Sequence, residues 1–72
     1  MKYYAKLSAN DDSVITIYRW NSSEPDYVQD VWNKAENTWK KTELLFEYLA
    51  SGEPSIEEIT ENQAKSLFPE AF

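Results

Sequence analysis

The sequence predicts a small α+β domain, in which an antiparallel sheet of three to four strands precedes one or two short C-terminal helices. Residues 2–32 carry runs of β-branched and aromatic side chains separated by polar turns, a pattern typical of antiparallel strands. Residues 42–68 instead carry two helix-start signals and a glycine stop. With 72 residues, the chain is expected to form a single domain, 1–72, with a small core.

Residues 14–20 give the clearest strand signal, because β-branched and aromatic side chains dominate them. Strand alternation divides them into two sets: Val14, Thr16, Tyr18 and Trp20 on one face, and Ile15, Ile17 and Arg19 on the other. Both faces are partly apolar, so we expect a central strand. Residues 2–7 alternate more weakly and are expected to pair with it through a polar turn at 9–13.

Residues 27–32 follow another polar turn and are expected to form a third strand, with Val28 and Trp32 on one face. A short fourth strand is expected to begin at 39–41. The alternative is a helix over 27–41, because apolar side chains recur there at near-helical spacing: Val28, Val31, Trp32, Ala35 and Trp39. Strands are the preferred interpretation.

The first helix is expected over 43–51, with Thr42 as its N-cap and Gly52 just past its end. Its apolar stripe is broad, so little of the helix is expected to be exposed. The stripe consists of Leu45, Tyr48 and Leu49, widened by Leu44 and Phe46.

Residues 55–59 are ambiguous between an edge strand and a helical turn. After them, Thr60 and Gln63 have the spacing of a capping box, in which each side chain bonds the other residue's backbone amide. A second helix is therefore expected over 61–68, ending before a proline.

The order of short motifs between residues 18 and 67 resembles that of short proteins from phage and actinobacterial genomes, which read VWD…GW…G…EIT…EA. The motifs in this chain are Tyr18-Arg19-Trp20, Val31-Trp32, Trp39, Gly52, Glu58-Ile59-Thr60 and Gln63-Ala64. The chain departs from the pattern at Asn33, where Asp is usual. It also lacks the glycine before Trp39, which argues against a tight hairpin there. The resemblance implies no activity.

The chain has no His and no Cys, and only one Gly. The missing residues exclude disulfides, Cys nucleophiles and Ser-His nucleophiles, and they make a zinc site improbable. One glycine cannot build a phosphate-binding loop. We therefore expect neither an enzyme nor a cofactor or metal site. A Ser-Lys arrangement stays open on composition alone.

Acidic residues are concentrated in the second part of the chain. Residues 1–41 have six acids and six bases, whereas residues 42–72 have seven acids and only Lys65, so the net charge of −6 arises there. This distribution argues against binding nucleic acid through its phosphates and favours a basic protein partner. Glu57, Glu58 and Glu61 are the candidate acidic patch, although acids also serve solubility alone.

Eleven residues are aromatic, from three Trp, five Tyr and three Phe. They either fill the core of a small domain or form an interface, where Trp, Tyr and Arg dominate the binding energy. The candidate aromatic patch is Tyr18, Arg19, Trp20, Trp32 and Trp39. The only local basic cluster surrounds Trp39 and consists of Lys34, Lys40 and Lys41.

The preferred functional hypothesis is a small acidic protein-binding module, a phage or prophage accessory or inhibitory factor that acts by occlusion. A sharper form is a DNA mimic whose carboxylates replace phosphates. The alternatives are a binder that stacks single-stranded nucleic acid or carbohydrate on its aromatic rings, and a structural domain that forms homodimers. No apolar run is long enough to cross a membrane, and the start of the chain has no signal-peptide pattern, so a cytoplasmic location is expected, or the host cytoplasm for a phage protein.

Overall fold

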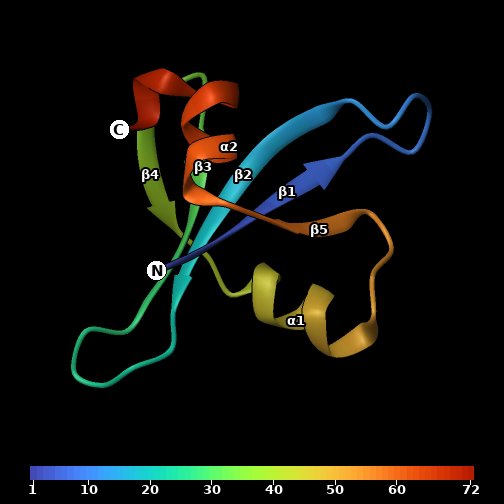
Figure 1. Ribbon diagram of the computed structural model, residues 1–72. Coiled ribbons are helices and arrows are strands. Elements are labelled where there is room, and N and C mark those ends of the chain that lie inside the picture. Colours follow the sequence, from blue (N-terminus) through green and yellow to red (C-terminus); the bar gives the residue numbers. More distant parts are fainter.

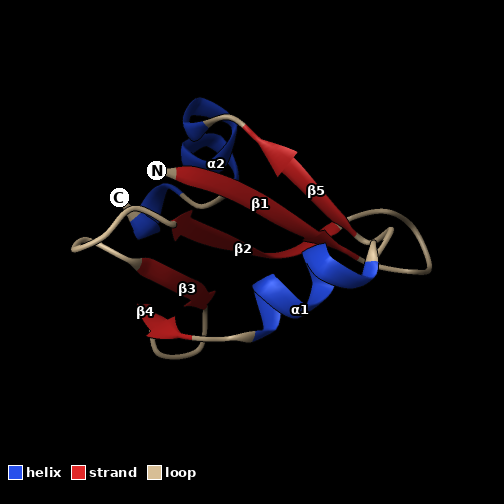
Figure 2. Cartoon of the chain, turned by 90° about the horizontal axis from the view of Figure 1, so that it is seen from below, coloured by secondary structure: helices blue, strands red, loops and turns tan.

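The computed structural model describes residues 1–72. The elements in chain order are β1 (Lys2–Leu7), β2 (Val14–Asn21), β3 (Val28–Asn33), β4 (Thr38–Lys41), α1 (Leu44–Ser51), β5 (Ile56–Ile59), α2 (Glu61–Leu67) and the 3₁₀ turn η1 (Pro69–Ala71). The five strands form one antiparallel sheet with the order β4-β3-β2-β1-β5. Helix α1 packs against one face, and α2 with η1 packs against the other (Figures 1 and 2).

The α+β class is confirmed, but the sheet is larger than predicted. Residues 56–59 form a fifth strand at the edge beside β1, rather than a helical turn. The backbone N–H of Leu7 donates to the carbonyl of Ser55 at 2.7 Å and so starts this pairing. The pairing gives the second edge of β1 backbone hydrogen-bond partners, since β2 occupies the other edge. The alternative helix over 27–41 is wrong, since β3 and β4 occupy that segment.

A β-hairpin joins β3 and β4 although no glycine stands before Trp39. Asn33 pairs with Thr38, and the side-chain oxygen of Asn33 accepts a hydrogen bond from the backbone N–H of Glu36 at 3.0 Å. Asn37 adopts a left-handed conformation with φ of 55°. Asparagine tolerates this region better than other non-glycine residues, so Asn37 takes the place of glycine in the turn.

A bulge in β2 overturns one predicted face assignment. Lys6 pairs with Thr16, but the next residue, Leu7, pairs with Val14, so Ile15 is an extra residue in the ladder. Val14 therefore packs beside Ile17 rather than on the face of Tyr18, where strict alternation placed it. The remainder of β2 alternates as predicted and is central in the sheet.

The core consists of two clusters, one on each face of the sheet. The cluster under α2 and η1 contains Tyr3, Ile17, Trp32, Ala64 and Phe68. The cluster under α1 contains Tyr4, Tyr18 and Leu45. Adjacent residues of β1 and β2 thus contribute to opposite clusters, and both faces of the sheet need a cover.

The helix ends follow the local signals closely. Thr60 and Gln63 form the predicted capping box, with bonds of 2.8 and 3.1 Å. Gly52 ends α1 in the left-handed conformation, with φ of 70°. The prediction of Thr42 as N-cap is wrong by one residue, because Glu43 has that position. The Thr42 hydroxyl instead accepts from the N–H of Leu44 at 3.0 Å.

Helix α1 is more exposed than predicted. Leu45 is fully buried, but 48% of Leu44 and 57% of Phe46 are exposed. A helix that lies on a sheet buries one narrow side, and these two residues flank Leu45 in the sequence, so they point away from the sheet.

Three core tyrosines have hydroxyl groups that resist ionisation. Burial raises the pKa of Tyr3, and the Glu61 carboxylate beside it raises that pKa further. Burial is also the main cause that raises the pKa of Tyr4 and of Tyr18. The charge of Glu58 adds a smaller increase for Tyr4, and Tyr48 does so for Tyr18. The folded protein therefore keeps these protons to a higher pH than the unfolded chain does.

Stability is expected to fall in alkaline solution. In the unfolded chain Tyr3, Tyr4 and Tyr18 ionise near the ordinary pKa of 10.0, whereas in the folded protein they ionise at higher pH. The free energy of unfolding should hold below that pH and decrease as the pH rises above it. Urea denaturation at about pH 8 and about pH 11 measures the loss. Tyr18→Phe should reduce the alkaline loss, and an equal loss in that variant would contradict the explanation.

The left-handed residue of the β3–β4 turn gives a second prediction. Asn37→Val should lower the free energy of unfolding by about 1–2 kcal/mol, because a β-branched side chain clashes in that conformation. Asn37→Gly should leave stability unchanged or slightly higher. Urea denaturation compares the two variants, with Glu36→Ala in the same turn as the control. An equal loss for the Gly and Val variants would show that the backbone conformation is not the cause.

Candidate functional site

The predicted aromatic patch is divided between the two faces of the sheet. Tyr18 and Trp20 lie on the face that α1 covers, whereas Trp32 and Trp39 lie on the face that α2 and η1 cover. Tyr18 and Trp32 are 5% and 4% exposed. The structure therefore does not bring the five residues together in one surface.

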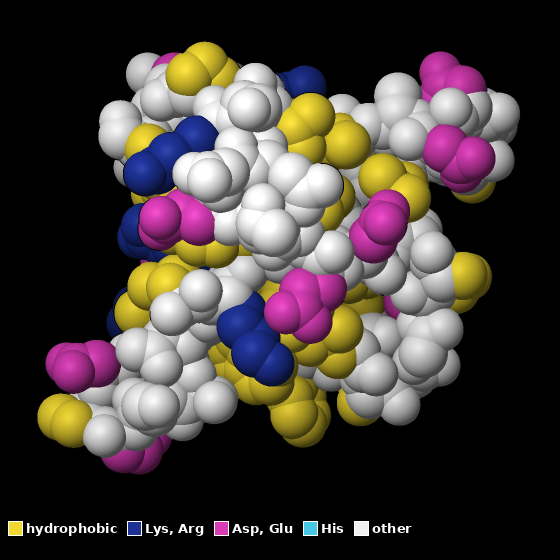
Figure 3. Space-filling view, in the orientation of Figure 1, with side chains coloured by type: hydrophobic (Ala, Val, Ile, Leu, Met, Phe, Trp, Pro, Cys, Tyr) yellow, Lys and Arg dark blue, Asp and Glu magenta, His cyan; other side chains and the backbone are white.

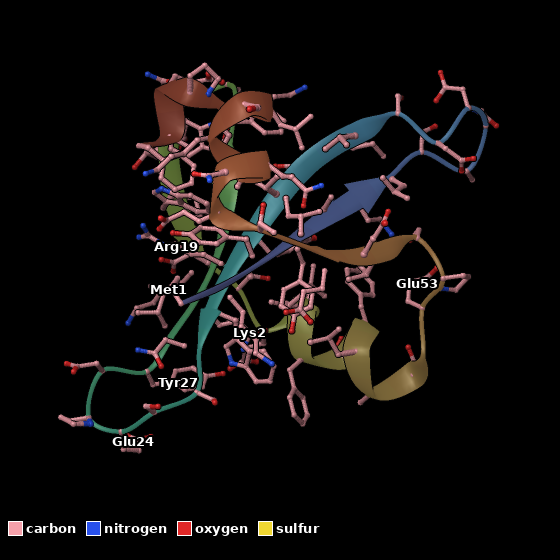
Figure 4. All side chains as sticks on the ribbon, in the orientation of Figure 1. Met1, Lys2, Arg19, Glu24, Tyr27 and Glu53 are labelled. Atoms are coloured by element: carbon pink, nitrogen blue, oxygen red, sulfur yellow. The ribbon has the colours of Figure 1, made fainter.

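Arg19 has internal partners and does not project as an interface residue. Its guanidinium carbon lies 4.3 Å from the centre of the Trp39 ring, and its Nη2 lies 2.8 Å from Oδ2 of Asp30. The Trp39 indole also donates to the carbonyl of Ala71 at 3.1 Å and meets the Trp32 ring edge-on. These contacts tie β2, β3 and β4 to η1. In Figure 4 Arg19 lies beside the crowded side chains of that side of the sheet.

The predicted acidic patch is also divided. Glu57 and Glu58 are neighbours in β5, so they point to opposite faces, opposite Ala5 and Tyr4 respectively. Glu61 starts α2, accepts from the Tyr3 hydroxyl at 3.4 Å and pairs with Lys65 at 3.6 Å. No group of three or more acidic residues is placed to hold a metal ion.

The lysines of the predicted basic cluster each have different surroundings. Lys34 lies 5.7 Å from the centre of the Phe68 ring, and Lys40 pairs with Glu36. Lys41 lines a hollow at the end of the sheet near α1. These lysines do not form a continuous basic surface around Trp39.

The structure leaves two aromatic rings without a ring or cation partner, Tyr27 and Phe46. Every other aromatic side chain contacts another ring or a cation: Tyr3, Tyr4, Tyr18, Trp20, Trp32, Trp39, Tyr48, Phe68 and Phe72. Tyr27 is 48% exposed and Phe46 is 57% exposed. The fold uses neither ring in its core.

Both free rings line the same hollow, although they are far apart in the sequence. The hollow has a volume of about 370 Å³ and is lined by Tyr27, Gln29, Glu43, Phe46 and Glu47. We call it the Tyr27–Phe46 hollow. Figure 4 shows Tyr27 between the tip of the β2–β3 loop, where Glu24 lies, and α1.

A second hollow of about 570 Å³ adjoins the first and shares Tyr27, Gln29 and Glu43 with it. Its further lining residues are Val28, Asp30, Lys41 and Thr42. The two hollows together form a depression where β3, the connection to α1 and the first turn of α1 meet.

Gln29 organises this depression. It is the only non-aromatic polar residue that is buried, at 7% exposure. Its Nε2 donates to the Tyr27 hydroxyl at 2.6 Å, and its Oε1 accepts from the backbone N–H of Phe46 at 2.9 Å. The first N–H groups of a helix have no partner within the helix, so Gln29 supplies one from the sheet. One side chain therefore positions both free aromatic residues.

The Tyr27–Phe46 hollow is acidic and its acids are unpaired. The ion pairs of the chain are Arg19–Asp30, Glu36–Lys40 and Glu61–Lys65. None of them involves Glu43 or Glu47, which stand one helical turn apart. Glu24 and Asp26 of the adjacent β2–β3 loop are likewise without an ion-pair partner, and Figure 3 shows acidic side chains at the tip of that loop.

The sequence contained signals for this site that the predictions did not use. Phe46 lies outside the stripe of Leu45, Tyr48 and Leu49, so its exposure follows from helical spacing. Tyr27 follows the turn residues before β3 and precedes that strand. Gln29 had no local signal, because its partner Phe46 is 17 residues away.

No protein-family model, curated protein or solved structure matches this chain. No helix in the structure combines the length and the apolar character needed to cross a membrane.

Replacing Gln29 should weaken the attachment of α1 to the sheet. Gln29→Met keeps the approximate volume but leaves the N–H of Phe46 without its acceptor, so we expect a loss of about 1–3 kcal/mol in the free energy of unfolding. Gln63→Met is the matched control, since it removes one bond of an exposed cap. Urea denaturation should show the larger loss for Gln29→Met. Equal losses would mean that the bond to Phe46 does not hold the helix.

Proposed function

We propose that this chain is a small protein-binding module that docks a basic partner at the Tyr27–Phe46 hollow. One observation supports the proposal above others. The two aromatic rings that the fold leaves unused, Tyr27 and Phe46, line one hollow together with the unpaired carboxylates of Glu43 and Glu47.

The chemistry of the hollow suits an interface. Large aromatic side chains contribute much of the binding energy of protein interfaces, because they bury a wide area with few rotatable bonds. Gln29 holds Tyr27 and the backbone of Phe46 in place before a partner binds, which reduces the entropic cost of binding. Glu43 and Glu47 attract a basic surface and repel an acidic one.

The proposed mechanism is occlusion. The module covers a functional surface of its partner and performs no chemical step itself, so it is not an enzyme. We retain the phage or prophage origin as part of the proposal, with action as an accessory or inhibitory factor in the cytoplasm of the cell or host.

The other functional hypotheses receive less support from the geometry. A DNA mimic needs a row of carboxylates, but Glu57, Glu58 and Glu61 point in different directions. Stacking of bases or sugars on the predicted tryptophans is disfavoured, because Trp32 is buried and Arg19 lies over Trp39. At the exposed rings of Tyr27 and Phe46, the carboxylates of Glu43 and Glu47 would repel nucleic acid.

Affinity capture from a nuclease-treated cytosolic lysate tests the proposal. The wild-type chain should retain a basic protein at low salt and release it at high salt, because screening weakens charge attraction. The double variant Tyr27→Ala/Phe46→Ala should retain at least about tenfold less, since it removes both anchors.

The control removes two exposed apolar side chains elsewhere, Ile15 and Leu67, which are 47% and 43% exposed. Ile15→Ala/Leu67→Ala should capture the same protein as wild type. Unchanged capture by the Tyr27/Phe46 double variant would disprove docking at the hollow. Recovery of nucleic acid in place of protein from lysate without nuclease would favour the stacking hypothesis.

A further inference from the structure

Building on the function proposed above, we infer that the Tyr27–Phe46 hollow binds one arginine side chain of the basic partner. We call this binding site the arginine seat. The arginine guanidinium would lie against the Tyr27 and Phe46 rings and bond the carboxylates of Glu43 and Glu47. The lining combines two half-exposed aromatic side chains with unpaired negative charge, and a guanidinium complements both.

Elsewhere in the chain, some groups of these two kinds do have a cation partner, among them the carboxylates of Asp30, Glu36 and Glu61. Lysine or arginine lies over four other aromatic rings: Lys6 over Tyr48, Arg19 over Trp39, Lys34 over Phe68 and Lys65 over Phe72. No cation lies over Tyr27 or Phe46, and no base pairs with Glu43 or Glu47. Lys41 lines the adjoining hollow but not the Tyr27–Phe46 hollow. The seat is therefore open to a cation from outside the chain.

Within the same chain, Arg19 contacts an aromatic ring and a carboxylate at the same time. Its guanidinium lies over the Trp39 ring at 4.3 Å while its nitrogens contact Asp30 at 2.8 and 2.9 Å. One planar group thus satisfies a ring face and a carboxylate together. The Tyr27–Phe46 hollow offers the same two kinds of partner without the guanidinium.

Arginine fits this lining better than lysine. A guanidinium is flat, stacks on aromatic faces and has five N–H donors, so it can bond two carboxylates while it lies on a ring. An ammonium group is compact and strongly hydrated, and it loses more of its water on the same contacts. Glu43 and Glu47 stand one turn apart on α1, which suits a donor that reaches in two directions.

The hollow is also prepared for binding. The Gln29 amide donates to the Tyr27 hydroxyl and accepts from the backbone N–H of Phe46, so one buried side chain links Tyr27 to the backbone of α1 at Phe46. A site whose walls are held in place loses less entropy when it closes on a ligand. The repulsion between Glu43 and Glu47 would in turn be relieved by the bound cation.

An NMR titration of the isotope-labelled full chain tests the inference. The ligand is a short Gly/Ser peptide with one central arginine, compared with the same peptide that carries lysine or the neutral isostere citrulline. The arginine peptide should shift the backbone amides of Tyr27, Glu43, Phe46 and Glu47 with a dissociation constant of about 1 mM. The lysine peptide should bind about threefold more weakly and the citrulline peptide at least about tenfold more weakly.

Two charge variants complete the test. Glu43→Gln/Glu47→Gln should weaken arginine binding at least about fivefold. Both side chains are exposed, so the variant should fold, with only a small loss of stability from removing negative charge at the N-terminus of α1. Glu57→Gln/Glu58→Gln, which makes the same change on β5, should bind as wild type does. Four results would each overturn the arginine seat. The citrulline peptide could bind as tightly as the arginine peptide, or the shifts could centre on β5. Both variants could weaken binding equally, or no shift could occur up to about 20 mM peptide.

The two proposals fail in different ways. If citrulline binds as well as arginine while Tyr27→Ala/Phe46→Ala still abolishes capture of the basic protein, the arginine seat is wrong and docking at the hollow stands. If the arginine peptide binds in the hollow but capture does not respond to that double variant, the docking proposal is wrong and the seat stands.

Discussion

The structure depends on a sheet that is apolar on both faces and has only short helices to cover it. Neighbouring residues such as Tyr3 and Tyr4, or Ile17 and Tyr18, enter opposite clusters. The covering helices have eight and seven residues. Such helices shield only part of a five-stranded sheet, so large rings must widen the cover. This requirement explains why nearly all the aromatic side chains have partners within the fold, and why an aromatic-rich sequence leaves few rings for a ligand.

Local patterns predicted the elements whose causes are local. The capping box of Thr60 and Gln63, the left-handed Gly52 and the alternation of β2 beyond its bulge depend on residues close together in the chain. The fifth strand and the bulge at Ile15 depend on pairing with a distant strand. Residues 56–59 have an ambiguous pattern, and only the open edge of β1 makes them a strand. Propensity could not reveal that edge.

The candidate site was harder to predict than the fold. Trp32 and Arg19 belong to residue types that dominate interfaces, but the same types fill cores and bind one another, as they do here with Trp39. The sequence alone indicates no more than an ordinary strand residue at Gln29. Its importance comes from a bond across 17 residues to the backbone of Phe46, which only the packing of α1 creates. A residue type alone therefore indicates neither burial nor role.

The exposure of Phe46 follows from the way α1 is attached. Leu45 must point into the sheet, and the N–H of Phe46 must meet Gln29, so the Phe46 side chain turns outward whatever residue stands there. A polar side chain at this position would serve the fold equally well and would favour solubility. The fold therefore does not require a phenylalanine beside a half-exposed tyrosine and two unpaired glutamates. Under the docking proposed above, a cationic side chain of the partner would bury both rings and neutralise both carboxylates at the same place.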